Sequence, residues 1–345
     1  MGQVRADHRL DLVGAPSFLT MIGAREASWR PAAALALVLP LGGGLMLFGF
    51  LVSGLLNNWI IQVAVLGMRP TWPTNVLAAA ASGRVVCQGC LMGGVTDTVM
   101  VAVISAAWMT ALLVSVAGVY RRPALTFVTA APRFRWRLFW VGLVLFGLVL
   151  GAIATAPDAV HGWPDRPVFL KADEQVRVRI AYVIVMLIGL PLAAAFEEVL
   201  CRGWLLQVTA AFTRSLPAIL IANSLVFAML HLDGDAGRNI SRVVLGMALS
   251  WGVLRTGGLE LGIGIHAANN LVILVLAQTL QQSEAVSHSS AFSVAVNLLV
   301  SLIAIGVIEL VARWGPLRRW SGLEVPGDEA QAPDIGRANS TLAAP

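Results

Sequence analysis

Two adjacent carboxylates and an arginine interrupt an apolar run in the stretch Phe196-Glu197-Glu198-Val199-Leu200-Cys201-Arg202. An ionisable side chain costs about 3 kcal/mol at mid-membrane on insertion scales, so such a cluster indicates function by default. Neighbours on a helix lie about 100° apart, so Glu197 and Glu198 face different ways. Glu198 and Arg202 are four residues apart and can pair on one face, which leaves Glu197 free for chemistry. The alternative is a structural ion pair with one additional acid.

Two further motifs place polar side chains in apolar segments. His231 ends the stretch Phe227-Ala228-Met229-Leu230-His231, and His266 lies four residues before Asn270. His266 and Asn270 therefore share a helix face. Asn269 nearly shares that face, so spacing does not decide which amide points inward. Each residue alone is also compatible with a simple hydrogen bond between helices.

Helix geometry predicts where these side chains could meet. If a helix hairpin turns near Arg214, Glu197 and His231 each lie about 17 residues from the turn, or roughly 26 Å. This requires the helix that begins at Ile180 to continue to about Phe212. His266 lies roughly 13 Å beyond a second turn at residues 257–258. The three side chains meet only if the first hairpin projects about 10 Å further into the cytoplasm than the second.

The composition excludes a soluble protein. The 345 residues are 57% hydrophobic and 12% charged, with a mean hydropathy of +0.78. Repeated apolar runs of about 20 residues predict an all-α polytopic membrane protein with about eight transmembrane helices. The predicted spans are 31–56, 95–119, 138–156, 180–212, 216–231, 240–254, 259–280 and 291–311.

Arginines between the spans predict the orientation. They follow the second, fourth, sixth and eighth spans, and basic loops stay in the cytoplasm. Both termini of this multi-pass cell-membrane protein are therefore predicted to be cytoplasmic. Lys171 and the arginines of loop 157–179 run against this pattern. The predicted organisation is a cytoplasmic segment 1–30, three spans in 31–179 with a long outer loop 57–94, a catalytic core 180–280 formed by spans four to seven, a last span in 281–320 and a disordered tail 321–345.

The cysteines carry little chemistry in this interpretation. Cys87 and Cys90 form a single C-x-x-C pair in the predicted outer loop, which is a weak metal signal without a second pair. They could form a disulfide or be inert. The first residues hold several charges and show no cleavable signal peptide.

The three motifs together resemble the CPBP intramembrane proteases, which include CAAX prenyl endopeptidases and bacteriocin-processing or immunity-type proteins. The family pattern E-E-x-x-x-R corresponds to Glu197-Glu198…Arg202, F-x-x-x-H to Phe227…His231, and H-x-x-x-N to His266…Asn270. The resemblance covers about residues 180–280. It implies an intramembrane endopeptidase that hydrolyses a peptide bond with a glutamate-activated water, in a cavity open to the cytoplasm.

The resemblance also implies a role for each residue. Glu197 is the base, His231 holds the water and returns the proton, and His266 and Asn270 stabilise the oxyanion. Glu198, Arg202 and Phe227 support them. No cofactor is expected. The alternative is a zinc protease with His231, His266 and Glu197 as ligands, although the H-E-x-x-H arrangement is absent.

The expected partners are the lipid bilayer and a peptide or membrane-protein substrate, either prenylated or a leader peptide, and no nucleic acid. A second class of function is a non-enzymatic transporter or scaffold, since transporters also place polar residues at mid-membrane. No internal repeat supports that class. The identity of the substrate is not readable from these residues.

Overall fold

The computed structural model describes residues 28–64, 91–161, 175–277 and 289–323, together with residues 18, 19, 22, 23, 26 and 67. These residues form helices joined by turns, with one isolated β-bridge between Thr129 and Gly258. The predicted all-α membrane architecture is confirmed. Cys87 and Cys90, most of segment 1–30 and most of tail 321–345 lie outside the described residues.

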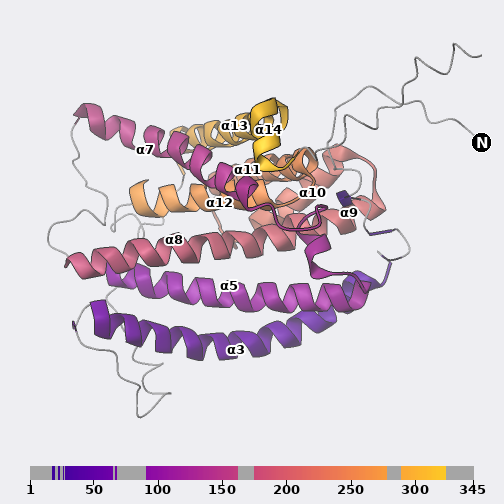
Figure 1. The fold of residues 1–345 in the computed structure, drawn as a ribbon, viewed down its shortest axis with the longest axis horizontal. Helices are drawn as coiled ribbons and strands as arrows, with labels where there is room; N and C mark the ends of the chain where they lie inside the picture. The colour runs from indigo at the N-terminus through magenta and orange to yellow at the C-terminus, as the bar shows by residue number, and fades with distance from the viewer. Residues whose placement is uncertain are drawn as a thin grey trace, which may run out of the picture.

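Three long helices lie side by side in one layer (Figure 1). They are α3 (Arg30–Ala64), α5 (Leu91–Tyr120) and α8 (Val176–Glu198), with α5 packed between the other two. Both α3 and α5 are longer than predicted, since the expected outer loop 57–94 contains the end of one helix and the start of the other. Residues 68–90 of that loop lie outside the described residues.

The extension of α3 has a local cause. The predicted loop begins at Asn57, but Asn57 is buried and its Nδ2 donates to the backbone oxygen of Thr96 at 3.2 Å. A polar side chain whose donor is satisfied by a neighbouring helix can remain inside a membrane bundle. The apolar residues after Asn57 then continue the helix to Ala64.

The second layer is organised by a close helix crossing. The third span consists of α6 (Trp136–Val141), the π-helical turn η2 (Gly142–Phe146) and α7 (Gly147–His161). It crosses α12 (Glu260–Leu271) where both helices carry glycine. A Cβ on Gly264 would lie 2.2 Å from the backbone oxygen of Phe139, and one on Gly142 would lie 2.5 Å from that of Leu261. This approach fixes α12, which carries His266.

The fourth span is unusually long, as expected. Helix α8, the π-helical segment η4 (Val199–Leu205) and α9 (Leu206–Phe212) form a continuous apolar stretch of 37 residues, Val176–Phe212. The remaining helices are α10 (Leu216–Met229), α11 (Ala236–Thr256), η5 (Val272–Ala277), α13 (Ala291–Arg313) and α14 (Gly315–Ser321). Helix α11 packs between α10 and α13 (Figure 1).

Five helical stretches of the described chain are long and apolar enough to cross a membrane. They are Arg30–Ala64, Leu91–Tyr120, Trp136–Thr155, Val176–Phe212 and Ala291–Arg313. The predicted spans five and seven correspond to α10 and to Glu260–Leu276, which are apolar but shorter. The sixth corresponds to α11, which carries Arg238, Arg242 and Arg255 and does not meet the same criterion.

The two turns lie at different levels, as the expected hairpin offset requires. Gly257 ends α11 with a φ of +68°, a left-handed conformation that favours glycine. Leu259, just after this turn, lies against Gly203 of the fourth span. A Cβ added to Gly203 would lie 3.2 Å from Cδ1 of Leu259. The helix continues nine residues beyond Gly203, to Phe212, which adds about 13 Å. The α9–α10 hairpin therefore extends past the α11–α12 turn.

Candidate active site

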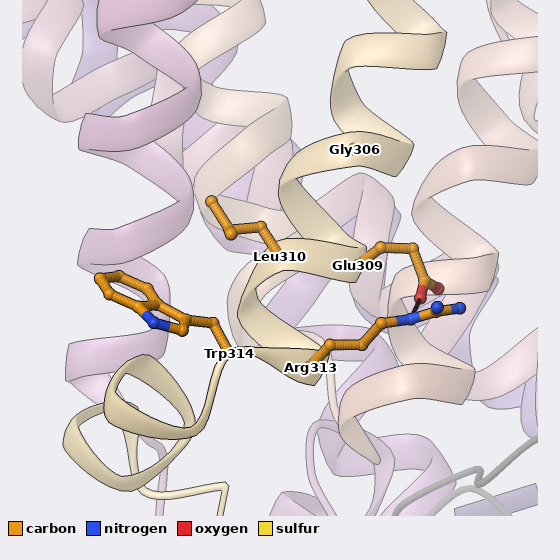
Figure 2. Close-up of a pocket in the computed structure, with 5 residues that line it drawn as sticks. All are labelled: Gly306, Glu309, Leu310, Arg313 and Trp314. Atoms are coloured by element: carbon orange, nitrogen blue, oxygen red, sulfur yellow. Dashed lines mark hydrogen bonds and ion pairs between the residues drawn. The ribbon is translucent and has the colours of Figure 1, made fainter.

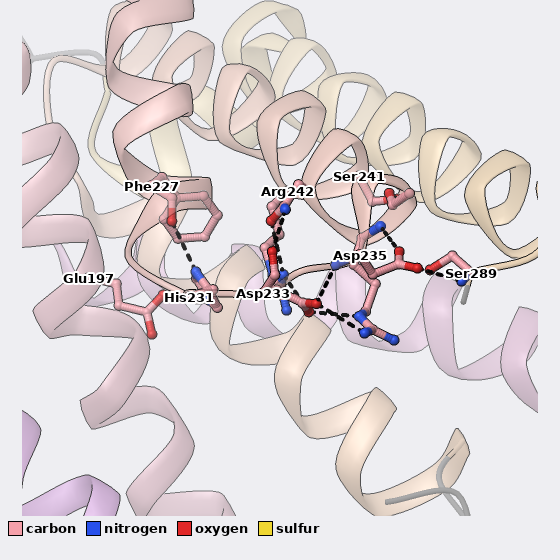
Figure 3. A network of polar contacts seen from close by, with 11 residues as sticks. Glu197, Phe227, His231, Asp233, Asp235, Ser241, Arg242 and Ser289 are labelled. Carbon is pink, nitrogen blue, oxygen red and sulfur yellow. Dashed lines mark hydrogen bonds and ion pairs between the residues drawn. The ribbon is translucent and has the colours of Figure 1, made fainter. Parts of the chain in front are cut away.

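Three different helices bring Glu197, His231 and His266 together. Glu197 lies at the end of α8, His231 just after α10, and His266 in the middle of α12. Oε2 of Glu197 is 3.9 Å from Nε2 of His231, and Figure 3 shows these two side chains beside each other. The same oxygen is 3.6 Å from Nε2 of His266. The sequence predicted this convergence. It places two imidazole nitrogens against a single carboxylate oxygen.

Glu198 connects two of the motifs. Its Oε1 accepts from Nη1 of Arg202 at 2.9 Å, and Nδ1 of His266 lies 2.8 Å from the same oxygen. All three residues are buried. The pairing with Arg202 was expected from the four-residue spacing, whereas the bond to His266 was not, because the two residues are 68 positions apart.

The hydrogen bonds define the tautomers of both histidines. Nδ1 of His231 lies 2.9 Å from the backbone oxygen of Phe227, which can only accept, and Nδ1 of His266 faces a carboxylate. Both Nδ1 atoms must therefore carry hydrogen. When His231 is neutral, its Nε2 then presents a lone pair toward Glu197.

One carboxylate oxygen of Glu197 has an unsatisfied hydrogen-bonding capacity in the described structure. Oε2 of Glu197 is buried and has no hydrogen-bond partner among the described residues. The separations of 3.6 Å and 3.9 Å exceed a hydrogen bond but allow one water molecule to contact both groups. Because the neutral Nε2 of His231 and the carboxylate of Glu197 are both acceptors, a water that donates one hydrogen to each suits the site. The side chains of Glu197 and His231 are 27% and 29% exposed, so the bundle does not enclose them completely.

The aromatic ring of Phe227, one helical turn before His231, contacts side chains of all three motifs. The guanidinium carbon of Arg202 lies 4.2 Å from the centroid of its ring, a cation–π distance. The ring also meets His231 and His266 edge-on, at centroid distances of 5.0 Å and 5.7 Å. Phe227 therefore contacts all three motifs and orients both imidazoles.

The π-helical segment η4 begins immediately after Glu198. Such segments within α-helices are frequent at functional sites. Arg202 lies in this segment, against Gly246 of α11, where an added Cβ would be 3.0 Å from its Nη2. The absence of a side chain at position 246 thus makes room for the guanidinium group.

The two amides after His266 differ in burial. Asn269 is buried and its Nδ2 donates to Oδ1 of Asn270 at 3.4 Å. Asn270 is half-buried, one turn beyond His266 on the same helix face. The oxyanion-binding role of Asn270 stays a prediction.

Sequence reasoning missed two ion-pair groups next to the site. Arg135, counted only as a basic loop residue, donates from Nε and Nη2 to the buried Glu260 at 2.9 Å and 2.7 Å. This pair anchors the start of α12. Asp233 and Asp235, just after His231, bind arginine and backbone groups of α11 (Figure 3). Spacing gave a partial signal, since each acid precedes an arginine by a few residues.

The residues of the zinc alternative offer a suitable set of donors. Two imidazole nitrogens and a carboxylate oxygen are ligands that zinc accepts, with the Nδ1–H groups held by second partners. Among the described residues, however, no group of three or more His, Cys, Asp and Glu side chains has the arrangement of a metal site. The donor types fit zinc and the present arrangement does not form a site for it.

A second surface feature lies elsewhere. A shallow groove on α13 is lined by Gly306, Glu309, Leu310, Arg313 and Trp314 (Figure 2). It shares no residue with the cluster around Glu197.

Comparisons with known proteins agree with the three motifs. Residues 179–272 match the family described as Type II CAAX prenyl endopeptidase Rce1-like. The chain is 24% identical over 161 residues to the Bacillus subtilis (strain 168) protein titled Uncharacterized protein YyaK. The aligned region covers 45% of this chain and 52% of that protein. The chain thus spans about half the length of the curated relative it matches. No solved structure matches.

Proposed function

Since residues 179–272 form an Rce1-like region of the CPBP type, we propose that the protein is an intramembrane endopeptidase in which Glu197 activates the attacking water. One observation carries this proposal: Nε2 atoms of two histidines, one just after α10 and one in α12, lie within 3.9 Å of the same oxygen of Glu197, which has no hydrogen-bond partner in the described part of the chain. A carboxylate beside two imidazoles has the composition of a general-base site for a water bound between them.

In the proposed first step, Glu197 removes a proton from the water while the oxygen of that water attacks the scissile carbonyl carbon. His231 orients the water through Nε2, because its Nδ1–H is held by the backbone oxygen of Phe227. The negative charge moves to the carbonyl oxygen. A carboxylate and an imidazole within reach of one water make this transfer geometrically feasible.

The oxyanion requires donors. His266 as an imidazolium keeps its Nδ1–H on Glu198 and offers its Nε2–H, and the amide of Asn270 is the second proposed donor. One such donor contributes about 10²–10³ in rate in other hydrolases. The tetrahedral intermediate then collapses, and the proton held by Glu197 passes through His231 to the leaving amine.

Glu198, Arg202 and Phe227 act as positioning residues in this proposal. Glu198 orients His266 by accepting from its Nδ1–H, Arg202 neutralises Glu198, and the ring of Phe227 lies against Arg202. None of them needs to touch the substrate.

The proposed substrate is a peptide or membrane-protein segment that reaches the site from the cytoplasmic side. The name of the matching family supports a prenylated C-terminal peptide as the first substrate to try. Leader peptides and membrane-protein tails are the alternatives. We further propose a location in the cell membrane with both termini in the cytoplasm.

The decisive test uses purified protein in detergent and an internally quenched farnesylated CaaX peptide, followed by leader peptides and unprenylated tails. Glu197→Gln should lower kcat by about 10²–10⁴, the usual contribution of a general base, without loss of folding. Full cleavage by this variant would contradict the mechanism. A parent protein that cleaves none of the probes would favour the non-enzymatic transporter or scaffold.

The metal-free form of the proposal is tested on the same preparation. Metal analysis should find substoichiometric zinc, and activity should persist after dialysis against a chelator. Stoichiometric zinc whose removal abolishes cleavage would assign Glu197, His231 and His266 as ligands instead.

A further inference from the structure

His231 lies outside regular helix. Helix α10 ends at Met229, and the following turn is closed by backbone bonds from His231 to Ala228 and from Leu232 to Met229, at 3.2 Å and 3.1 Å. The imidazole contacts α10 through its hydrogen bond to the backbone oxygen of Phe227 and through the edge of the Phe227 ring, while its backbone belongs to the turn. The direction of its Nε2 therefore depends on the residues that follow.

The residue after His231 has an unusual backbone conformation. Leu232 has a φ of +47°, in the left-handed region that residues with a branched side chain rarely adopt, and its side chain is 93% exposed. Such a conformation persists only where the surrounding structure enforces it. A contact on the far side of Leu232 must hold the turn.

Asp233 supplies that contact. Its Oδ2 accepts from Nε of Arg238 at 2.7 Å and from Nη1 of Arg242 at 2.9 Å, and Nη2 of Arg238 reaches its Oδ1 at 3.0 Å (Figure 3). Its backbone oxygen accepts from Asn239 at 2.7 Å. The side-chain carboxylate and the backbone oxygen of Asp233 are thus both bound to side chains of the first two turns of α11.

The anchor extends to a third helix. Asp235 caps α11 by accepting from the backbone nitrogen of Arg238 at 2.7 Å, and its Oδ2 accepts from that of Ser289, just before α13, at 2.8 Å. The backbone nitrogen of Asp235 donates to Oδ1 of Asp233 at 2.9 Å. The turn that follows His231 is therefore connected to the ends of α11 and α13.

Asp233 is ionised wherever the protein would be assayed. Hydrogen bonds from Arg238, the backbone N–H of Asp235 and Arg242 hold the pKa of Asp233 well below its usual range. A carboxyl group with a lowered pKa loses its stabilising effect only in strong acid.

We propose that Asp233, through Arg238 and Arg242, is a positioning residue that holds His231 beside Glu197. The inference rests on the proposed function, because it gives the network a role in the proposed reaction. It also has a physical consequence without any substrate: loss of the Asp233 carboxylate lets Leu232 relax, and His231 moves away from Glu197.

The kinetic test replaces Asp233 by Asn, which keeps the size of the side chain and removes its charge. We expect kcat on the quenched peptide to fall about 10-fold or more, since a misplacement of about 1 Å can cost up to 10²-fold. KM should stay within about twofold, because no substrate contact is removed. Arg242→Gln, which removes one of the two paired arginines, should give a smaller loss of the same kind.

Glu309→Gln is the matched control. Glu309 is also a carboxylate that pairs arginines of two helices, Arg255 and Arg313, but it lies in the groove on α13 (Figure 2). Its variant should keep the parental kcat. If Asp233→Asn and Glu309→Gln lose the same amount of kcat, the loss comes from general destabilisation of the protein. That result would overturn the inference.

A second readout needs no activity. In a background with Cys87, Cys90 and Cys201 replaced by Ala, cysteines are placed by Glu197→Cys and His231→Cys and joined with a short bis-methanethiosulfonate. Adding Asp233→Asn should slow cross-linking about threefold or more, because the effective concentration of the two thiols falls. An unchanged cross-linking rate overturns the inference. If the parent cleaves no peptide, the proposed function fails and this rate alone decides the role of Asp233.

Discussion

Glu198 is fully buried and shares one oxygen between a guanidinium and an imidazole. Its neighbour Glu197 directs toward the two histidines an oxygen that has no hydrogen-bond partner among the residues described. One helical step thus separates an acid that organises the site from an acid available for reaction. The two side chains should respond differently to the same substitution.

Glu198→Gln should lower the stability of the protein as well as its activity. Removing one partner of a buried ion pair leaves Arg202 uncompensated, and the cost is typically about 3–5 kcal/mol. Thermal unfolding in detergent measures this loss. Glu197→Gln should change the stability much less, and equal destabilisation by the two variants would contradict the division of roles.

The residue types of the site could be predicted from the sequence, but their partners could not. Helical spacing identified the pair of Glu198 and Arg202, which are four residues apart. The bond from His266 to Glu198 depends on how α8 and α12 pack, and no local pattern encodes that packing. Asp233 was missed for a similar reason: its arginines lie beyond a turn whose course follows from the fold.

At the level of helices, the crossing of α12 with the third span depends on two glycines. The Cβ positions of Gly264 and Gly142 lie within 2.5 Å of backbone oxygens on the opposite helix. Small residues allow such close approach in membrane bundles. The crossing therefore sets the height of His266 relative to Glu197.

Gly264→Ala should destabilise the protein by about 1–3 kcal/mol, as expected for overpacking against atoms that cannot rotate away. Gly306→Ala is the control, since an added Cβ there meets no atom within 4 Å in the described part of the chain. Comparison of the two thermal unfolding midpoints measures the difference. Equal midpoints would mean that the helices can separate slightly without cost.

The order of the helices and the length of the fourth span were predictable from apolar runs and from the hairpin arithmetic. Helix ends were less so. The extension of α3 to Ala64 depends on Thr96, which accepts the amide hydrogen of Asn57. The early start of α5 involves Gly94, which lies against the ring of Tyr182. Both ends are set by packing between helices that are distant in sequence.

For the whole molecule, the arrangement of charges predicts the orientation in the membrane. Arginines gather after α5 and near the end of α13, and basic segments remain cytoplasmic. This orientation predicts that the turn between α9 and α10 lies in the cytoplasm and that the start of α13 lies outside the cell. The exposed residues Ser215 and Ala291 mark these two places.

Cysteines introduced by Ser215→Cys and Ala291→Cys, in a background without native cysteines, test this orientation. A membrane-impermeant maleimide should label position 291 in intact cells and position 215 only after permeabilisation. Labelling of position 215 in intact cells would reverse the predicted topology and place the site on the opposite side.

Helix α10 has 14 residues and extends about 21 Å, whereas the hydrocarbon layer of a bilayer measures about 30 Å. Because its end is followed by His231 and by the charged network of Asp233, lipid tails cannot surround it fully. The bilayer beside α10 should be locally thinner and hydrated. A polar peptide bond could then approach along the side of α10 and reach Glu197 without first crossing the hydrocarbon core of the bilayer.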